Sequence, residues 1–297
     1  MSEESTIAAP RKNSRAHKRR AERQPYRKPG QSIGRVVVWG YACIALAPLI
    51  LVLVNSFRPT ADFVSNPVGF PTHLYLDNYK VALSQGNFFA IISNSLLYAG
   101  VGAIVATFIS VLAAYALARW NVRGGSVIVI IFLSGLMIPI QYSALPLFQE
   151  FSKFGLVDSR IGIILFYAAS GVPFSTYVLL PFCRQLPKDL EDAAMLDGAS
   201  LGSAFFRVML PLLRPGIVAV AMFNFMPLWN QFFYPLILLR SPDKFPISVG
   251  LTSFFGEHSV DFGPLFAALV VSAVPLVAIF MIGVRKIVDG LATGGVK

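Results

Sequence analysis

Acidic side chains surround an alanine pair in the middle of an otherwise apolar chain: Glu191, Asp192, Ala193, Ala194 and Asp197. Carboxylates grouped in this way can accept charge-assisted hydrogen bonds from the cations or backbone N–H groups of a partner. They can also do no more than cap and solvate a short helix, because the helix dipole favours negative charge in the first turn. Gly198 follows, where a glycine can end a helix in the left-handed conformation without a Cβ penalty. The group therefore indicates either a docking surface or a solvated helix end.

Residues that could hold a metal or catalyse a reaction are scattered along the chain. The three histidines are His17, His73 and His258, and no His, Cys or carboxylate cluster has metal-ligand spacing. Cys43 and Cys183 fall within or beside apolar runs, which argues against a disulfide framework. The sequence also lacks a Walker pattern, a dinucleotide-binding glycine fingerprint and a nucleophile elbow. We therefore expect no metal, cofactor or catalytic residue in this chain, and no hydrolysis by it.

The composition is that of a membrane protein. Hydrophobic residues make up 55% of the 297 residues, charged residues make up 13%, and the mean hydropathy is +0.65. Charge-free runs long enough to cross a hydrocarbon layer of about 30 Å are read as membrane-spanning helices. Six are expected, at residues 36–54, about 93–117, about 126–147, 161–182, 216–239 and about 264–284.

The distribution of cations predicts the orientation. Most of the 25 Lys and Arg residues fall in segments on the side of the two termini, and cations are retained on the cytoplasmic face during insertion. We therefore expect both termini to be cytoplasmic. The basic tail, residues 1–32, has no apolar periodicity and is expected to be disordered. It could bind nucleic acid or anionic lipid, but the favoured interpretation is an enlarged orientation signal with some attraction to membrane lipid. Residues 33–297 form the membrane domain.

The connection at residues 184–215 is long and has helical signals of its own. Pro187 and Asp189 suit a helix start, with Asp189 able to cap, and Gly198 ends this first helix. Ser200 can cap a second helix, whose extension Pro211 and Pro215 limit. Apolar residues recur in the second helix at helical spacing: Leu201, Ala204, Phe205, Val208 and Leu212. Helices this short are unstable alone in water, so the unit must pack on its own membrane domain, on the membrane surface or on a separate cytoplasmic protein.

These residues resemble the EAA loop of permease subunits of binding-protein-dependent ABC importers. The matching positions are Asp192, Ala193, Ala194, Gly198, Val208, Leu210 and Pro211. Asp192 stands where Glu is usual and Val208 where Ile is usual, which preserves charge and shape. Other segments resemble the carbohydrate branch, in particular the maltose-type G subunit: Asn94-Ser95, the run 114–119, Met137-Ile138-Pro139, Leu186-Pro187, Asp197-Gly198-Ala199, the run 229–232 and the run 290–297. Gln231 replaces the Glu of that branch's WNEF run. The resemblance covers about residues 78–297.

The resemblance implies an all-α membrane protein with the type I ABC importer permease fold, six transmembrane helices and a cytoplasmic coupling-helix elbow. It implies alternating-access import of a sugar or oligosaccharide in a prokaryotic cytoplasmic membrane. The implied partners are a second permease subunit, two cytoplasmic ATPase subunits that bind ATP and Mg, and an extracytoplasmic solute-binding protein, with no nucleic acid. The residues implied to couple to the ATPase are Glu191, Asp192, Ala193, Ala194, Asp197, Gly198, Ala199 and Pro211.

Polar residues inside apolar runs are candidates for a substrate path: Gln141, Tyr142, Ser143, Asn224, Asn230 and Gln231. Trp229 joins them, because sugars are held by aromatic stacking together with amide and hydroxyl hydrogen bonds. Each of these side chains could equally bond a neighbouring helix or anchor a helix at the membrane interface. By position, the outside loops at residues 150–158 and 241–261 would face the binding protein.

Other functions stay open at this point. A channel or secondary transporter would explain six spans, but not the elbow, and would more often place ionisable residues inside its spans. The six predicted spans contain no Asp, Glu, Lys, Arg or His. An intramembrane enzyme would require a nucleophile, an acid pair or a metal cluster at membrane depth, and none is apparent. Within importers, a polyol, amino acid or peptide substrate remains an alternative to a sugar.

Overall fold

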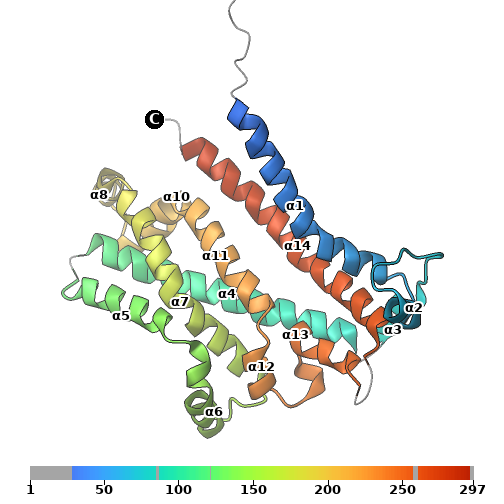
Figure 1. Cartoon of the computed structure of the whole chain (residues 1–297). Coiled ribbons are helices and arrows are strands. Elements are labelled where there is room, and N and C mark those ends of the chain that lie inside the picture. The colour runs from blue at the N-terminus through green and yellow to red at the C-terminus, as the bar shows by residue number, and fades with distance from the viewer. Residues whose placement is uncertain (1–28, 85–86, 121, 257–259, 295–297) are drawn as a thin grey trace, which may run out of the picture. The chain divides into compact units, whose positions relative to one another are not determined.

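The structure is a computed structural model that describes residues 29–84, 87–120, 122–256 and 260–294 (Figure 1). In these ranges the regular structure is helical, with one isolated bridge between Phe255 and Val260. The chain divides into two compact units, residues 1–50 and residues 51–297. Most of the predicted basic tail lies outside the described residues, so its disorder stays a prediction.

Spanning helices are confirmed, but two of the predicted spans are interrupted. In the described part of the chain four helical segments are long and apolar enough to cross a membrane alone: Gly34–Asn55, Phe88–Arg119, Arg160–Gln185 and Phe262–Val284. They belong to α1 (Pro29–Asn55), α4 (Phe88–Arg119), α7 (Arg160–Gln185) and α14 (Phe262–Gly294). The number rises to six when two bent helix pairs each count as one span. The all-α membrane architecture is therefore as expected.

The predicted third span is a bent pair and not one continuous helix. α5 (Gly125–Met137) ends before Pro139, and the chain resumes as η1 (Ile140–Ser143) and α6 (Ala144–Lys153) after a bend of 93°. Proline lacks the N–H that an uninterrupted helix requires, and it disfavours helical backbone at the residue before it. The expectation of an unbroken span at residues 126–147 was wrong for this reason.

The predicted fifth span also breaks. α11 (Arg214–Trp229) stops at Asn230, and α12 (Phe233–Leu238) follows as a separate short helix, so residues 216–239 are not one helix. If α11 is half of a bent span, the other half precedes it in the chain: the helical segment Leu201–Leu212 meets α11 at an angle of 75°. That preceding segment consists of α9 (Leu201–Ala204), the π-helical turn η2 (Phe205–Met209) and α10 (Leu210–Leu212).

Within residues 51–297, α4 is the central helix. It makes its most extensive contact with α7 and also packs against α11, which in turn packs against α14 (Figure 1). Small residues permit the close approach of α4 and α7: a Cβ added at Gly102 would lie 2.6 Å from the Cβ of Tyr167. The short helices α2 (Thr60–Ser65), α3 (Asp77–Ser84), α13 (Ile247–Gly250) and the 3₁₀ turns η3 (Pro242–Lys244) and η4 (Leu251–Phe254) form the connections between the long helices.

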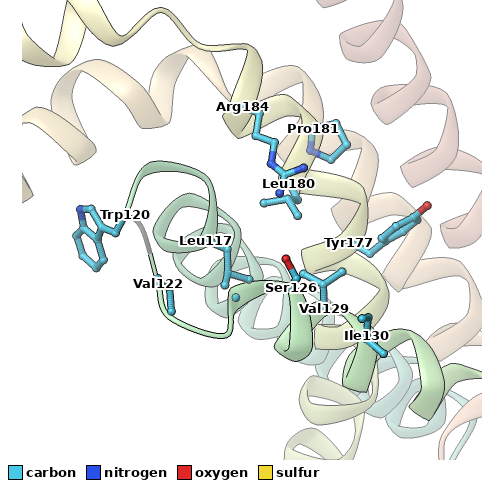
Figure 2. Close-up of a pocket in the computed structure, with 11 residues that line it drawn as sticks. Leu117, Trp120, Val122, Ser126, Val129, Ile130, Tyr177, Leu180, Pro181 and Arg184 are labelled. Atoms are coloured by element: carbon cyan, nitrogen blue, oxygen red, sulfur yellow. The ribbon is translucent and has the colours of Figure 1, made fainter.

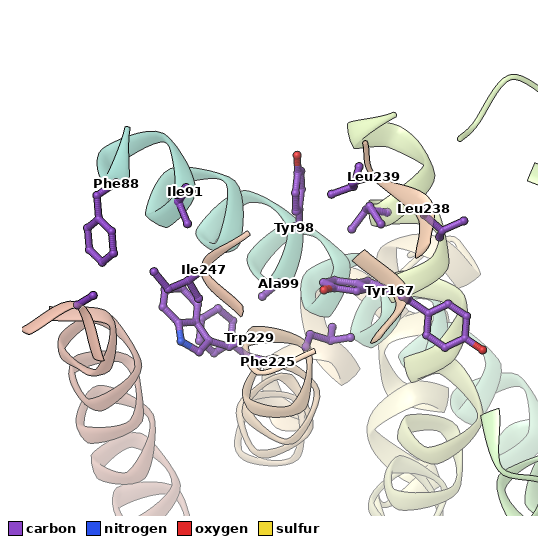
Figure 3. Close-up of a cluster of buried hydrophobic side chains, with 14 of the residues drawn as sticks. Phe88, Ile91, Tyr98, Ala99, Tyr167, Phe225, Trp229, Leu238, Leu239 and Ile247 are labelled. Atoms are coloured by element: carbon purple, nitrogen blue, oxygen red, sulfur yellow. The ribbon is translucent and has the colours of Figure 1, made fainter. Parts of the chain in front are cut away.

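Two apolar clusters hold these helices together. The larger one is formed by residues of α4, α7 and α11 with α12 and α13, and includes Tyr98, Tyr167 and Trp229 (Figure 3). The second, which we call the elbow core, lies where α4 and α7 end and α11 begins. It consists of Val111, Ala114, Tyr115, Leu179, Leu180, Cys183, Phe205, Met209, Leu213 and Val220. This set includes Phe205 and Met209, and its burial supplies the packing partner that the second short helical segment of the elbow requires.

The opposite end of the long helices is tied by polar contacts to the loop that carries η3. Asp158, in the connection before α7, accepts hydrogen bonds from the backbone N–H groups of Arg240 and Ser241, both at 3.0 Å. Its carboxylate also lies 2.9 Å from the ammonium of Lys244. These bonds hold the pKa of Asp158 well below its usual range, with the hydrogen bond from the Ser241 hydroxyl as the largest cause. Asp158 therefore stays ionised, and its charged carboxylate holds the loop in place.

Candidate functional site

The first elbow helix, α8, spans Lys188–Leu196 and ends as the sequence predicts. Gly198 has φ +84°, and its N–H donates to the Met195 carbonyl at 3.0 Å while the Ala199 N–H donates to the Ala194 carbonyl at 3.0 Å. The start differs from the prediction, because Pro187 occupies the cap position and Asp189 lies inside the first turn. There Asp189 stabilises the helix through the dipole and not as a cap.

The second elbow helix begins as predicted and ends at Leu212, between the two prolines that were predicted to limit it. The hydroxyl of Ser200 accepts a hydrogen bond from the Ser203 N–H at 3.3 Å, which caps α9. The helix then widens into the π turn η2 and continues through Pro211 to Leu212. Pro211 does not stop it, because Pro211 stands in the first turn of α10 after the π turn, where a missing N–H is tolerated. Pro215 lies at the start of α11.

Most of the predicted coupling residues lie together on the outer face of the elbow. Asp192, Ala193, Asp197 and Gly198 are exposed, and Ala194, Ala199 and Pro211 are half-buried. Beside them the large apolar side chain of Leu196 is 88% exposed. The outer face therefore combines carboxylates with uncovered apolar surface, as a docking surface does.

Glu191 departs from the prediction, because its side chain is buried and turned inward. One of its carboxylate oxygens lies 3.3 Å from Nε of Arg119, the last residue of α4. Arg119 also donates a hydrogen bond from Nη2 to the carbonyl of Leu186 at 2.8 Å, just before α8 begins. Glu191 lies on the opposite side of α8 from Leu196, so it anchors the helix to the membrane domain and is not part of the outer face.

A hollow of about 440 Å³ lies beside the elbow end, between the end of α4, the start of α5 and the last turns of α7 (Figure 2). Its walls are mainly apolar, with Leu117, Val129 and Leu180 among them, and Arg184 extends from α7 toward it. Among the residues that the structure describes, none of the predicted coupling or path residues lines this hollow. It is separate from both predicted sites.

Asn224 is the predicted path residue with the most defined surroundings. It is buried in α11, and its amide donates to the hydroxyls of Ser175 in α7 at 2.7 Å and Thr107 in α4 at 3.3 Å. It also borders a hollow of about 400 Å³ between α7 and α11. The aromatic residues Phe174 and Phe223 line the same hollow, with ring centroids 6.3 Å apart in an edge-to-face arrangement. The sequence analysis did not single out these two phenylalanines, although each directly precedes a polar residue, Ser175 after Phe174 and Asn224 after Phe223.

The other predicted path residues do not gather around this hollow. Trp229 is 3% exposed and packs against Phe225 in the larger apolar cluster, so in this conformation it is a core residue (Figure 3). Gln141 and Tyr142 are exposed in η1, and the Ser143 hydroxyl lies 2.8 Å from that of Tyr234. Asn230 caps its own helix by bonding the Met226 carbonyl at 2.9 Å. Gln231 is half-buried, and its backbone carbonyl accepts a hydrogen bond from the Ser248 hydroxyl.

Among the described residues, no group of three or more His, Cys, Asp or Glu side chains could hold a metal ion. Cys43 and Cys183 are both free thiols.

Comparison with known proteins decides the family. Residues 106–292, which include the whole elbow, match the family described as "Binding-protein-dependent transport system inner membrane component". The chain belongs to this family. It is 36% identical over 261 residues to the diacetylchitobiose uptake system permease protein NgcG of Streptomyces coelicolor, covering 87% of this chain and 86% of the relative. It is 33% identical over 260 residues to the arabinooligosaccharides transport system permease protein AraQ of Halalkalibacterium halodurans, covering 86% and 92%.

A solved structure shares the fold. One chain of a bacterial ABC transporter involved in the import of the acidic polysaccharide alginate superposes with a TM-score of 0.77 at 23% identity, covering 88% of this chain and 99% of that chain. The protein therefore has the type I ABC importer permease fold, as expected. As a family member it is a multi-pass component of the cytoplasmic membrane that works with a solute-binding protein and ABC subunits. The family is one of transport permeases and not of enzymes.

Proposed function

We propose that this chain is the transmembrane subunit of an ATP-driven importer that carries a sugar or oligosaccharide into the cell by alternating access. The relatives that it matches over most of its length are named for diacetylchitobiose, arabinooligosaccharides and sulfoquinovosyl glycerol, which are all carbohydrates or carbohydrate conjugates. The complex would contain this chain, a second permease subunit, two ATPase subunits that bind ATP and Mg, and an extracytoplasmic solute-binding protein.

The observation that carries the proposal is the outer face of the elbow. Asp192, Asp197 and the 88% exposed Leu196 surround the left-handed Gly198 at the end of α8. A short helix that presents an apolar side chain between carboxylates fits a groove with an apolar floor and cationic rim. We assign this groove to the ATPase subunit. The elbow end and both termini are then cytoplasmic, and the loops at residues 150–158 and 241–261 face the solute-binding protein.

The substrate path in this proposal follows the hollow between α7 and α11. Phe174 and Phe223 offer aromatic faces for a sugar ring, and Asn224 offers an amide at the inner wall. Gln141 and Tyr142 are exposed at the bend after α5, away from this hollow, and would contact the substrate only at another stage of its passage. Gln231 and Asn230 lie at the break after α11, and Trp229 supports this region from the core.

The test is affinity isolation of the detergent-solubilised importer, expressed with its partner subunits, for wild type and for Gly198→Asp. No atom lies within 4 Å of a Cβ added at Gly198, so the variant adds bulk and charge to the outer face without a clash, while the positive φ of 84° strains the backbone. Gly124→Asp is the matched control, because Gly124 has φ +81°, an equally open surrounding and a place outside the elbow. We expect wild type and the control to retain the ATPase and Gly198→Asp to lose it. Retention by all three would contradict docking at the elbow, and absence of an ATPase from wild type would contradict the importer.

A further inference from the structure

The joint between α4 and α8 is a buried ion pair, formed by two residues 72 positions apart in the chain. The side chains of Arg119 and Glu191 are 5% and 11% exposed, and their charged groups lie 3.3 Å apart. The same guanidinium bonds the Leu186 carbonyl at 2.8 Å, so one side chain of α4 holds both the start and the first turns of the elbow. A second, apolar contact joins α4 to the other helical segment of the elbow. The ring centroids of Tyr115 in α4 and Phe205 in η2 lie 4.7 Å apart.

A buried ion pair is a poor device for stability alone. Removing two charges from water costs about as much as their attraction returns, and apolar residues of similar size often stabilise a protein equally well. The apolar elbow core already supplies burial, but apolar contacts are not directional and permit sliding. Arg119 adds direction through a fixed donor of its planar guanidinium, the Nη2–H that bonds the Leu186 carbonyl. Its Nε makes no hydrogen bond among the described residues and attracts Glu191 by charge. Together the bond and the ion pair orient the start of α8 on a surface that is already packed.

The helix that carries Arg119 reaches the loops at the opposite end of the molecule. α4 has 32 residues and is therefore about 48 Å long. Near its first turns, Asn94 donates to the carbonyls of Asp243 and Phe245 at 2.8 and 3.1 Å, and the Ser95 hydroxyl accepts from the Ile247 N–H at 2.6 Å. Tyr98 adds a bond to the Lys244 carbonyl at 3.0 Å. One rigid helix is thus hydrogen-bonded to the far loop at one end and ion-paired to the elbow at the other.

We propose that Arg119 and Glu191 are positioning residues that make α8 and α4 move together, so that displacement of the elbow reaches the loop at residues 241–247 through α4. This inference rests on the proposed function, because it concerns how movement imposed by an ATPase on the elbow is transmitted. It assigns to Glu191 a role in transmission and none in ATPase docking, which separates it from its neighbour Asp192.

The experiment uses the complete importer reconstituted in proteoliposomes with its solute-binding protein. The quantities measured are the ATPase content, the ATP hydrolysis rate, the sugar transported per ATP and the unfolding midpoint. The variants are Glu191→Gln, Arg119→Lys, Arg119→Glu and the charge-exchanged double variant Arg119→Glu with Glu191→Arg. The control is Asp77→Asn, which removes an exposed ion pair with Lys80 in α3.

We expect Glu191→Gln to retain the ATPase and to hydrolyse ATP within about twofold of wild type, while transport per ATP falls about tenfold. Arg119→Lys keeps the positive charge but lacks the planar guanidinium that contacts both Glu191 and the Leu186 carbonyl. Its loss of transport per ATP should therefore be smaller than that of Glu191→Gln. The double variant should recover transport relative to Arg119→Glu, an effect that general destabilisation would not produce. Asp77→Asn should match wild type.

Three results would overturn the inference while leaving the importer intact. The first is transport per ATP at the wild-type level in both Glu191→Gln and Arg119→Glu. The second is loss of the ATPase from Glu191→Gln, which would make Glu191 a docking residue. The third is a double variant no better than Arg119→Glu, since the pair would then have no joint effect. If wild type itself holds no ATPase, the proposed function and this inference fail together.

Discussion

The amide nitrogen of Asn224 lies 2.7 Å from the hydroxyl oxygen of Ser175, so a buried hydrogen bond joins α11 to α7 in the middle of the membrane domain. The Ser175 hydroxyl in turn donates to the Gly171 carbonyl of its own helix at 2.7 Å. Both side chains are buried, so the bond between the helices satisfies polar groups that are withdrawn from solvent. The contact fixes the wall of the hollow that Phe174 and Phe223 line.

Replacing Asn224 by Leu should destabilise the folded protein by about 1–3 kcal/mol, because the bonds to Ser175 and Thr107 are lost and the larger Leu must fit beside Gly171. Thermal unfolding in detergent measures this loss. In a double-mutant cycle with Ser175→Ala, the two effects should be less than additive. Additive effects would show that the two side chains do not interact in the membrane protein.

Gly102→Ala should destabilise the contact of α4 with α7. The added Cβ would lie 2.6 Å from the Cβ of Tyr167, and overpacking of this kind costs about 1–3 kcal/mol. Gly100→Ala is the control from the same helix, because nothing lies within 4 Å of its added Cβ. The unfolding midpoints of the two variants should differ, with only Gly102→Ala lower than wild type. Equal midpoints would mean that the helices separate at little cost.

Asp158→Asn should remove a pH-dependent part of the stability. The folded pKa of Asp158 lies below its unfolded value of about 3.9, so its contribution is present above that value and is lost as pH falls through the folded pKa. Asn keeps the size and tolerates the positive φ of 54° at this position. The difference in unfolding midpoint between wild type and the variant should be largest near neutral pH and shrink below about pH 4. A difference independent of pH would exclude the carboxylate as its source.

Phe223→Ala should weaken substrate handling if the hollow between α7 and α11 is the sugar path. Loss of one aromatic contact is expected to raise the KM for transport about three- to tenfold, with the ATPase still bound. Phe89→Ala is the control, since Phe89 is an exposed phenylalanine at the start of α4 and away from the hollow. An unchanged KM in Phe223→Ala would show that the sugar does not pass through this hollow.

Much of the elbow could be predicted from local chemistry. Glycine tolerates the left-handed conformation at a helix C-terminus, and a serine hydroxyl can accept a free N–H at a helix N-terminus. Gly198 and Ser200 could therefore be assigned these places from the local sequence alone. The spanning helices α4 and α7 follow from apolar length in the same way. The bend at Pro139 could also have been inferred, because the restriction that proline imposes is local, but the apolar run concealed it.

The partners of buried polar side chains could not be predicted. Glu191 and Asp192 are adjacent and chemically alike, and only the packing of α8 on α4 decides that one is buried and the other exposed. Helical spacing offered a weak signal, since Glu191 shares a face with the half-buried Ala194 while Leu196 lies on the other. Trp229 illustrates the reverse case, where a plausible sugar-stacking residue belongs to the core because Phe225 and its neighbours enclose it.

The π turn at Phe205–Met209 sets the rotational phase of everything that follows it toward α11. A π turn accommodates one residue more than an α-helical turn, and one residue corresponds to about 100° of rotation around the helix axis. Phe205 and Met209 are both buried in the elbow core, so the surplus residue is absorbed without exposing either side chain. Deleting one residue here would keep the helix but rotate α10 about its axis, so that Leu210 and Leu212 would change face before the 75° bend into α11. The number of residues between Gly198 and Pro211 therefore constrains the geometry of the elbow as strictly as the identity of either residue does.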